Sequence, residues 1–345
     1  MLCTLFLLRP LYAMPYNGIN ISQPGHKETR RLIDLAPHSW FTHTDVSSIW
    51  VTGYRVLRVP KENFAIGPKV VDFNEVRAIV LYGALKYVDA SQAKIGVITD
   101  NQWHIDVLKI QVRETSEGVY LLFLAPFAVD GQLGNEPVTR EKISTAAGLF
   151  AAFNGRNIVY ERLFDNIIEM SDGRTSTFSP VFENPMWFTS PDLCDSRLNI
   201  ISKADKAITT LPEPDRNRIY LSLRWFEQAL YESGIDAYLK YWISLETLVM
   251  PDTTNIRPLN ESLSRAYNLS YEAIRDRFAI GKLFGLRCRI VHDGQLVPIH
   301  ADLLRYMEAL YADALLVHLG IPCDRRAASV IDNPEFALNE YLHEP

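Results

Sequence analysis

The sequence predicts an α+β protein, in which an N-terminal mixed α/β domain is followed by a C-terminal all-α helical bundle. Between Ser39 and Asp130 the chain contains short runs of β-branched and aromatic residues, which are typical of strands. Beyond Asp215, apolar residues recur at intervals of three and four, which places them on one face of long helices. The 345 residues are enough for two ordinary domains. We expect the domains and a C-terminal tail at residues 1–210, 211–322 and 323–345.

The N-terminal region contains strand patterns and helix patterns. Residues 50–57 and 118–124 predict strands, and residues 139–153 predict a helix. The segment 78–88 fits either a helix or a strand, and this choice stays open. Residues 157–170 predict a second helix, because their apolar residues form one stripe that a following Asp-Gly turn ends. The stripe consists of Ile158, Leu163, Phe164, Ile167 and Ile168.

The segment 174–214 mixes Thr, Ser, Pro and aromatic residues without a sustained period. We expect it to link the two domains, with the boundary at residues 211–215. The alternative is that it packs as strands against the first domain, as Thr177-Phe178 and Met186-Trp187-Phe188 suggest.

Four or five helices are expected in the C-terminal bundle. They cover residues 219–230, 238–249, 257–268, 271–292 and 300–319. Pro251 ends the second helix, and Gly281 and Gly285 are the expected break points if residues 271–292 form two helices. We expect the polar tail after Pro322 to dock on the bundle or to fray.

Charge and cysteine content narrow the class of protein. A net charge of −6 argues against a protein that coats nucleic acid non-specifically, although it allows a local basic site. The four cysteines form no CxxC pair, so neither a zinc site nor a disulfide framework is indicated, and a reducing cytoplasm fits best. They are Cys3, Cys194, Cys288 and Cys323. We expect no cofactor and no bound metal ion.

The apolar opening of the chain does not predict a membrane protein. Residues 1–8 lack a basic region before them and are followed by Arg9 and Pro10, which makes a poor signal peptide. The run is also too short to span a bilayer. We expect either a buried first strand or a true start at Met14 rather than secretion.

Several common enzyme motifs do not occur in the sequence. It contains no phosphate loop ending in GK[ST], no GxGxxG, no HExxH and no GxSxG. Enzymes with dispersed motifs remain open, among them metal-dependent nucleases whose carboxylates come from separate strands. For this hypothesis the candidate ligands in the N-terminal domain are Asp72, Asp100 and Asp106.

The segment that remains is RCRIVHDG, which places Arg287 five residues before His292. Spacing alone is not specific, because Arg31 also precedes His38 by seven residues, on either side of Pro37. Context distinguishes the two pairs, since only the later one lies in a helical bundle, directly before a helix-ending Asp-Gly.

Three segments together resemble the HEPN family, in particular its ApeA-like branch of bacterial defence proteins. They are LRWFEQAL at 223–230, YWISLETL at 241–248, and RCRIVHDG at 287–294. The resemblance covers the region from about Asp215 to Gly320. It implies a metal-independent endoribonuclease of the toxin or antiviral defence type, which acts on RNA as a homodimer with one composite cleft. The sequence differs at Cys288, where the family often has Asn, Asp or His.

The chemistry implied by this resemblance suits three residues. Metal-free RNA cleavage needs a group that moves a proton, and histidine is the residue type suited to this near neutral pH, which makes His292 the candidate. It also needs a cation for the phosphate, and Arg287 offers a planar fork of donors. Five positions along an ideal helix turn the chain by about 500°, which leaves the two side chains about 140° apart around the axis. They are therefore expected to meet only through a helix break or a second subunit. Glu246 lies among apolar positions and needs a cation, either Arg287 or Arg289.

Each of these residues also has a purely structural interpretation. His292 can cap a helix, Arg287 and Arg289 can be solvated surface charges, and Glu246 can hold the bundle by an ion pair. Trp225 and Trp242 fit core aromatics at helical spacing. The alternative function is a non-catalytic HEPN-like module for RNA binding or protein assembly. In both cases the N-terminal domain is expected to be a sensor, with a regulatory partner or ligand.

Overall fold

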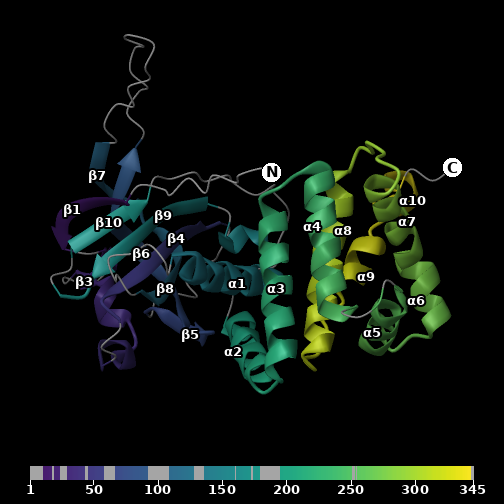
Figure 1. The fold of residues 1–345 in the computed structure, drawn as a ribbon, viewed down its shortest axis with the longest axis horizontal. Coiled ribbons are helices and arrows are strands. Elements are labelled where there is room, and N and C mark those ends of the chain that lie inside the picture. Colours follow the sequence, from purple (N-terminus) through teal and green to yellow (C-terminus); the bar gives the residue numbers. More distant parts are fainter. Residues whose placement is uncertain are drawn as a thin grey trace, which may run out of the picture. The chain divides into compact units, whose positions relative to one another are not determined.

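The N-terminal part of the chain forms an antiparallel sheet with one α-helix inserted before its last two strands, and the C-terminal part is all helical, which confirms the predicted α+β class (Figure 1). The structure is a computed structural model. By its contacts the chain forms a sheet unit, residues 1–143 and 159–183, and a helical unit, residues 144–158 and 184–345. The domain boundaries expected at residues 210 and 322 concern domains that fold separately, and they stay a prediction. The structure describes residues 11–17, 19–23, 29–42, 46–57, 67–91, 109–127, 136–159, 161–171, 174–178, 195–250, 253 and 255–342.

Ten strands among the described residues form one antiparallel sheet, in the order β1-β10-β9-β4-β8-β6-β2-β3, with β5 and β7 also paired to β6. They are β1 (Leu11–Asn17), β2 (Asn20–Ser22), β3 (Arg30–Arg31), β4 (Ser48–Val56), β5 (Lys69–Phe73), β6 (Val76–Ser91), β7 (Lys109–Glu114), β8 (Gly118–Phe127), β9 (Glu161–Glu169) and β10 (Arg174–Phe178). The strands predicted at 50–57 and 118–124 are confirmed as β4 and β8. The open segment 78–88 is a strand, inside β6.

The sheet is buried on both faces in its centre. One face packs against the 3-10 helices η1 (Leu32–Leu35) and η2 (His38–Thr42), and Ile49 and Val51 belong to this core. Trp50 points to the opposite face because side chains alternate along a strand. There the guanidinium of Arg140, from α1 (Glu136–Asn154), lies 5.1 Å from the Trp50 ring centroid.

The helix predicted over residues 157–170 is wrong. A short 3-10 helix, η5 (Arg156–Val159), is followed by β9, which lies between β4 and β10. Five consecutive residues of β9, 164–168, are buried, and a strand covered on both faces cannot be told from a helix by its apolar stripe. Burial alone would raise the pKa of the Asp165 carboxyl, but the charge of Arg162 lowers that pKa below its ordinary value.

The segment 174–214 contains more regular structure than expected. Its first residues form β10, which confirms the strand alternative for 177–178, whereas residues 186–188 lie outside the described residues. A helix that was not expected, α2 (Asp195–Thr209), ends shortly before the predicted boundary. Its buried side chains recur at helical spacing: Leu198, Ile201, Ala204 and Ile208.

Among the described residues between 213 and 318 the bundle has six helices instead of four or five. They are α3 (Glu213–Leu230), α4 (Gly234–Val249), α5 (Arg257–Tyr267), α6 (Tyr271–Phe278), α7 (Ile280–Val291) and α8 (Ala301–His318). The break between α6 and α7 falls at Ala279, with φ 49°, and not at either glycine. There the Phe278 carbonyl accepts a hydrogen bond from the Tyr306 hydroxyl at 2.8 Å, a partner that the sequence does not reveal. In the described part of the chain no helix is long and apolar enough to cross a bilayer.

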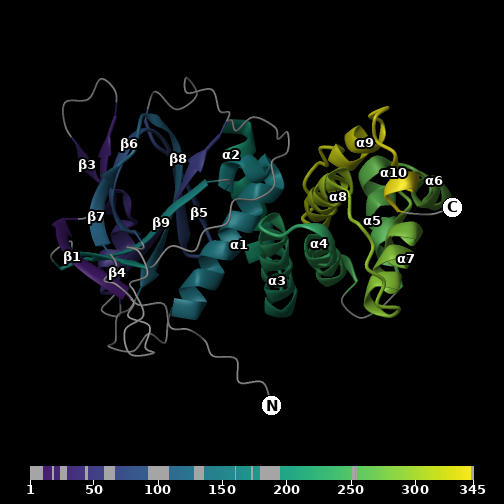
Figure 2. The same ribbon diagram turned by 90° about the horizontal axis from the view of Figure 1, so that it is seen from above.

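Helices α3, α4 and α8 lie side by side in both ribbon views (Figure 2). The Phe226 ring of α3 stacks on the Tyr311 ring of α8, with centroids 4.4 Å apart. Deep between the helices, the Ser222 hydroxyl donates to the Ser244 carbonyl of α4 at 2.8 Å. The apolar faces predicted for these three helices therefore form the core of the bundle.

The C-terminal half of α1 packs closely on α3, because its small residues permit a short distance between the helices. A Cβ atom added to Gly148 would lie 2.4 Å from the Leu223 carbonyl oxygen. We expect Gly148→Ala to lower the free energy of unfolding by about 1–3 kcal/mol, since backbone has to move. Gly285→Ala in α7 is the control, because its new Cβ meets nothing within 4 Å and should stabilise by up to about 1 kcal/mol. Urea unfolding followed by circular dichroism measures both, and equal effects would contradict the close contact.

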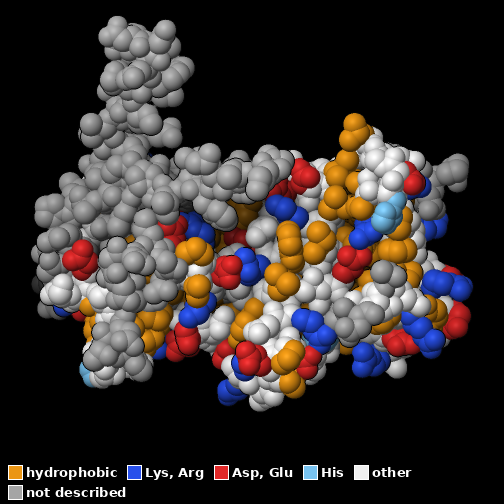
Figure 3. All heavy atoms as spheres, in the orientation of Figure 1, with side chains coloured by type: hydrophobic (Ala, Val, Ile, Leu, Met, Phe, Trp, Pro, Cys, Tyr) orange, Lys and Arg blue, Asp and Glu red, His pale blue; other side chains and the backbone are white. Residues whose placement is uncertain are grey.

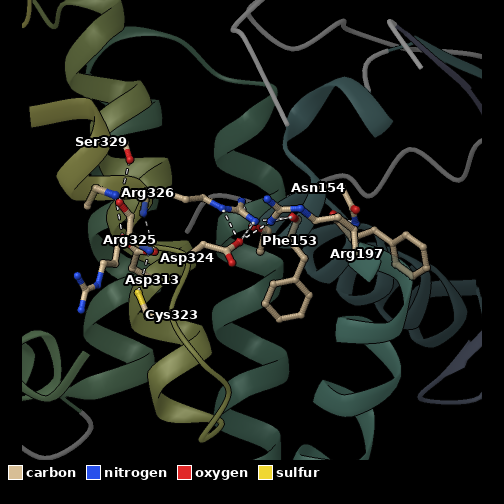
Figure 4. Close-up of polar contacts among 12 residues, drawn as sticks. Phe153, Asn154, Arg197, Asp313, Cys323, Asp324, Arg325, Arg326 and Ser329 are labelled. Atoms are coloured by element: carbon tan, nitrogen blue, oxygen red, sulfur yellow. Dashed lines mark hydrogen bonds and ion pairs between the residues drawn. The ribbon is translucent and has the colours of Figure 1, made fainter. Parts of the chain in front are cut away.

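The tail after Pro322 docks on the bundle through α9 (Arg326–Ile331) and α10 (Leu338–Tyr341). The buried Asp313 carboxylate of α8 accepts hydrogen bonds from the backbone N–H groups of Arg326 at 3.0 Å and Ala327 at 2.8 Å. In Figure 4, the Arg326 and Arg197 side chains converge on the Phe153 carbonyl, and Arg325 points away. The first of the two expectations for the tail, docking, is confirmed for its described residues.

Candidate functional site

Helices α4 and α7 build the candidate site from their contacting faces. The Tyr238 hydroxyl of α4 donates to the Leu283 carbonyl of α7 at 2.6 Å. The Trp242 and Phe284 rings add an aromatic contact, with centroids 5.9 Å apart. This packing fixes α7 relative to α4, so that the last turn of α7 lies beside the last turn of α4.

Arg287 and His292 meet at the C-terminal end of α7. The Arg287 Nη1 atom lies 3.1 Å from the His292 Nε2 atom. His292 is the C-cap, but it keeps helical angles (φ −95°, ψ −36°), and its N–H donates to the Cys288 carbonyl at 2.8 Å. The two side chains therefore meet within one chain and without a helix break between them, because the long arginine side chain reaches the imidazole; for this contact neither of the two expected routes is used.

Glu246 completes a group of three. Its Oε1 atom lies 3.7 Å from Arg287 Nε and accepts a hydrogen bond from Trp242 Nε1 at 2.7 Å. The Glu246 side chain is 26% exposed and that of Arg287 24%, so the pair is half-buried at the rim of the bundle. Of the two cations considered as a partner for Glu246, the structure pairs it with Arg287.

Arg289 is not a solvated surface charge, which corrects that interpretation. It is half-buried, and its Nη2 atom donates to the Leu342 carbonyl at the end of α10 at 2.7 Å. This contact joins the docked tail to α7 two residues after Arg287. Cys288 is half-buried between the two arginines, as a free thiol.

The surface beside the motif is open and partly apolar. His292 is exposed, as are Val291 at 48% and Leu296 at 92%. On the face drawn in Figure 3, basic and acidic side chains lie intermixed over the helices. A large polymer can therefore reach the imidazole, and any attraction for a phosphate is local to the site.

The three side chains can together move a proton and bind an anion. An imidazole can accept or donate a proton, and a guanidinium stabilises negative charge on phosphate oxygens. The carboxylate neutralises part of the guanidinium charge and limits its motion. The arrangement suits acid–base chemistry on a phosphate ester.

Of the three candidate metal ligands in the sheet unit, Asp72 lies among the described residues. Asp72 is exposed and accepts two hydrogen bonds from Arg77, at 2.7 and 2.8 Å, while Asp100 and Asp106 lie outside the described residues. Across the residues that the structure describes, no three His, Cys, Asp or Glu side chains lie close enough to hold a metal ion.

The second Arg–His pair of the sequence has a different arrangement, since Arg31 contacts Asp34 at 3.0 Å.

The sequence did not single out Trp242 as part of the site. Trp242 is a buried core aromatic as expected, and Trp225 is half-buried. The available signal was the four-residue spacing from Trp242 to Glu246, which places both on one helix face.

Three comparisons with known proteins bear on identity. No protein-family model, no curated protein sequence and no solved structure matches the chain. The function is therefore argued from the residues of the site.

Proposed function

We propose that this protein is a metal-independent endoribonuclease of the HEPN type, acting in the cytoplasm as a toxin or antiviral defence effector. The observation that supports the proposal best is the 3.1 Å contact between Arg287 and His292 at an exposed helix end, with Glu246 behind Arg287. The same residues carry the family resemblance in the sequence.

In the proposed reaction, the scissile phosphate binds Arg287, whose planar fork matches two phosphate oxygens. Arg287 then no longer engages His292 Nε2, which accepts the proton of the 2′-hydroxyl. The O2′–P bond forms and the P–O5′ bond breaks, and O5′ takes a proton from water or from a second imidazole. Arg287 stabilises the charge on the phosphate, and Glu246 holds Arg287 in place.

A homodimer through the helical unit fits this scheme, because a two-fold axis would place two motifs around one RNA strand. The second His292 would then be the acid that protonates O5′. In this proposal the sheet unit senses a trigger, through a partner or ligand, and restrains the nuclease until then.

The test is cleavage of a labelled single-stranded RNA in excess chelator. We expect the wild type to cut and the double variant Arg287→Ala, His292→Ala to be inactive. Arg257→Ala is the matched control, because it removes a positive charge from an exposed pair with Glu261 elsewhere on the bundle. Activity that disappears with the chelator would contradict the proposal, as would activity that survives in the double variant.

A second candidate function is a non-catalytic module for protein assembly or RNA binding. The exposed Leu296 and Val291 beside the motif favour it, since apolar side chains that cluster on a surface often mark an interface. Expression in a host distinguishes the two functions. A nuclease slows growth and His292→Ala relieves the effect, whereas an assembly module leaves growth unchanged in both forms.

A further inference from the structure

Trp242 differs from the other core aromatics of α4, because its polar atom faces the candidate site. The indole is fully buried, yet its Nε1 atom lies 2.7 Å from Glu246 Oε1. An indole N–H can only donate, so the carboxylate is the acceptor. Trp242 therefore fixes one oxygen of Glu246 from inside the bundle.

The same Glu246 oxygen also faces Arg287, at 3.7 Å from its Nε atom. Arg287 is thus held on one side by an anchored carboxylate and contacts His292 on the other. A half-buried arginine without that anchor has several rotamers available, and its side chain loses order. The position of the Arg287 fork relative to His292 hence depends on Glu246, and through it on Trp242.

The contact with Arg287 also determines where the neutral His292 ring carries its proton. A guanidinium has donors and no acceptor, so Nε2 of His292 must be the acceptor and the ring proton lies on Nδ1. We propose that Trp242 is a positioning residue, which acts through Glu246 and Arg287 to impose the Nδ1–H tautomer on His292. The consequence for RNA cleavage rests on the proposed function: this tautomer directs the Nε2 lone pair to the place where the phosphate would bind.

The experiment compares Trp242→Phe with Tyr241→Phe as a matched control. Both variants remove one buried polar hydrogen from an aromatic residue of α4, but the Tyr241 hydroxyl accepts a hydrogen bond from Arg156 and does not contact Glu246 or α7. The readout is ¹⁵N NMR of the histidine rings at about pH 9, where an ordinary imidazole is neutral. The chain has 8 histidines, and the spectrum of His292→Ala identifies the signals of His292.

We expect the wild type and Tyr241→Phe to show His292 as the Nδ1–H tautomer, and Trp242→Phe to show a mixture. RNA cleavage should fall by about 10- to 100-fold in Trp242→Phe, the fold-change expected for a lost hydrogen bond to a charged group, and stay within about twofold in Tyr241→Phe. In an Arg287→Ala background, Trp242→Phe should change neither quantity further, because its effect passes through Arg287.

A second variant excludes a simple packing effect. A benzothienyl-alanine at position 242 keeps the shape of the indole and lacks the N–H, and it should behave like Trp242→Phe. An unchanged tautomer in the folded Trp242→Phe protein would overturn the proposal, as would equal changes in Tyr241→Phe. If the tautomer shifts as expected and the wild type cuts no RNA, the positioning role stands and the proposed nuclease function fails.

Discussion

His292→Ala is expected to lower the rate of RNA cleavage by about 10²- to 10⁴-fold, the range associated with loss of a general acid or base. Without the imidazole, only water can take the 2′-hydroxyl proton at the end of α7. Arg287→Ala should give a loss of similar size, because the phosphate then lacks its cation. The double variant should be little worse than either single variant, since the two groups act as a unit.

Single-turnover cleavage at saturating protein measures these effects without interference from product release. His300→Ala is the matched control, because this imidazole follows in the same connection to α8 and stacks on Tyr341 at 4.3 Å instead of contacting Arg287. Its rate should stay within about threefold of the wild type. A His292→Ala protein that cuts as fast as His300→Ala would exclude His292 from the chemistry.

The sequence predicted best those elements whose burial follows one period. Helices α3 and α4 each bury one stripe, so apolar spacing identified them, whereas α8 is buried on all sides from Ala309 to Leu316. Strand β9 does not meet this criterion, because both of its faces are buried and its polar residues find partners on other strands. Asn166 donates from its Nδ2 atom to the Val88 carbonyl at 2.9 Å, and no local pattern reports such a partner.

For the candidate site, local information was sufficient for the helix end but not for the partners across helices. The Asp-Gly after His292 indicated where α7 ends, but it does not explain why Arg287 and His292 meet, because the chain is still helical at His292. The choice between Arg287 and Arg289 as the partner of Glu246 required the tail, because α10 provides the Leu342 carbonyl that engages Arg289. A contact between segments about fifty residues apart depends on how the tail docks.

Arg156→Met is expected to lower the free energy of unfolding of the helical unit by about 3–5 kcal/mol, the usual effect of breaking a buried ion pair. The Arg156 side chain is 2% exposed and lies 2.7 Å from the Glu308 carboxylate of α8. It also donates to the Tyr241 hydroxyl of α4 at 2.6 Å. Burial alone would lower the pKa of Arg156, but the Glu308 charge raises that pKa above its ordinary value. Removal of the cation leaves a mostly buried carboxylate without its partner.

The double variant Arg156→Met, Glu308→Leu tests whether the uncompensated charge is the cause, because it removes both ions and should recover most of the lost stability. Arg257→Met is the control for charge alone, since its pair with Glu261 is exposed and such pairs contribute about 0–1 kcal/mol. Thermal unfolding followed at 222 nm compares all three. If Arg156→Met and the double variant were equally unstable, the loss would come from packing and not from the charge left on Glu308. If Arg156→Met matched Arg257→Met, the pair that joins η5 to α8 would contribute no more than a surface ion pair.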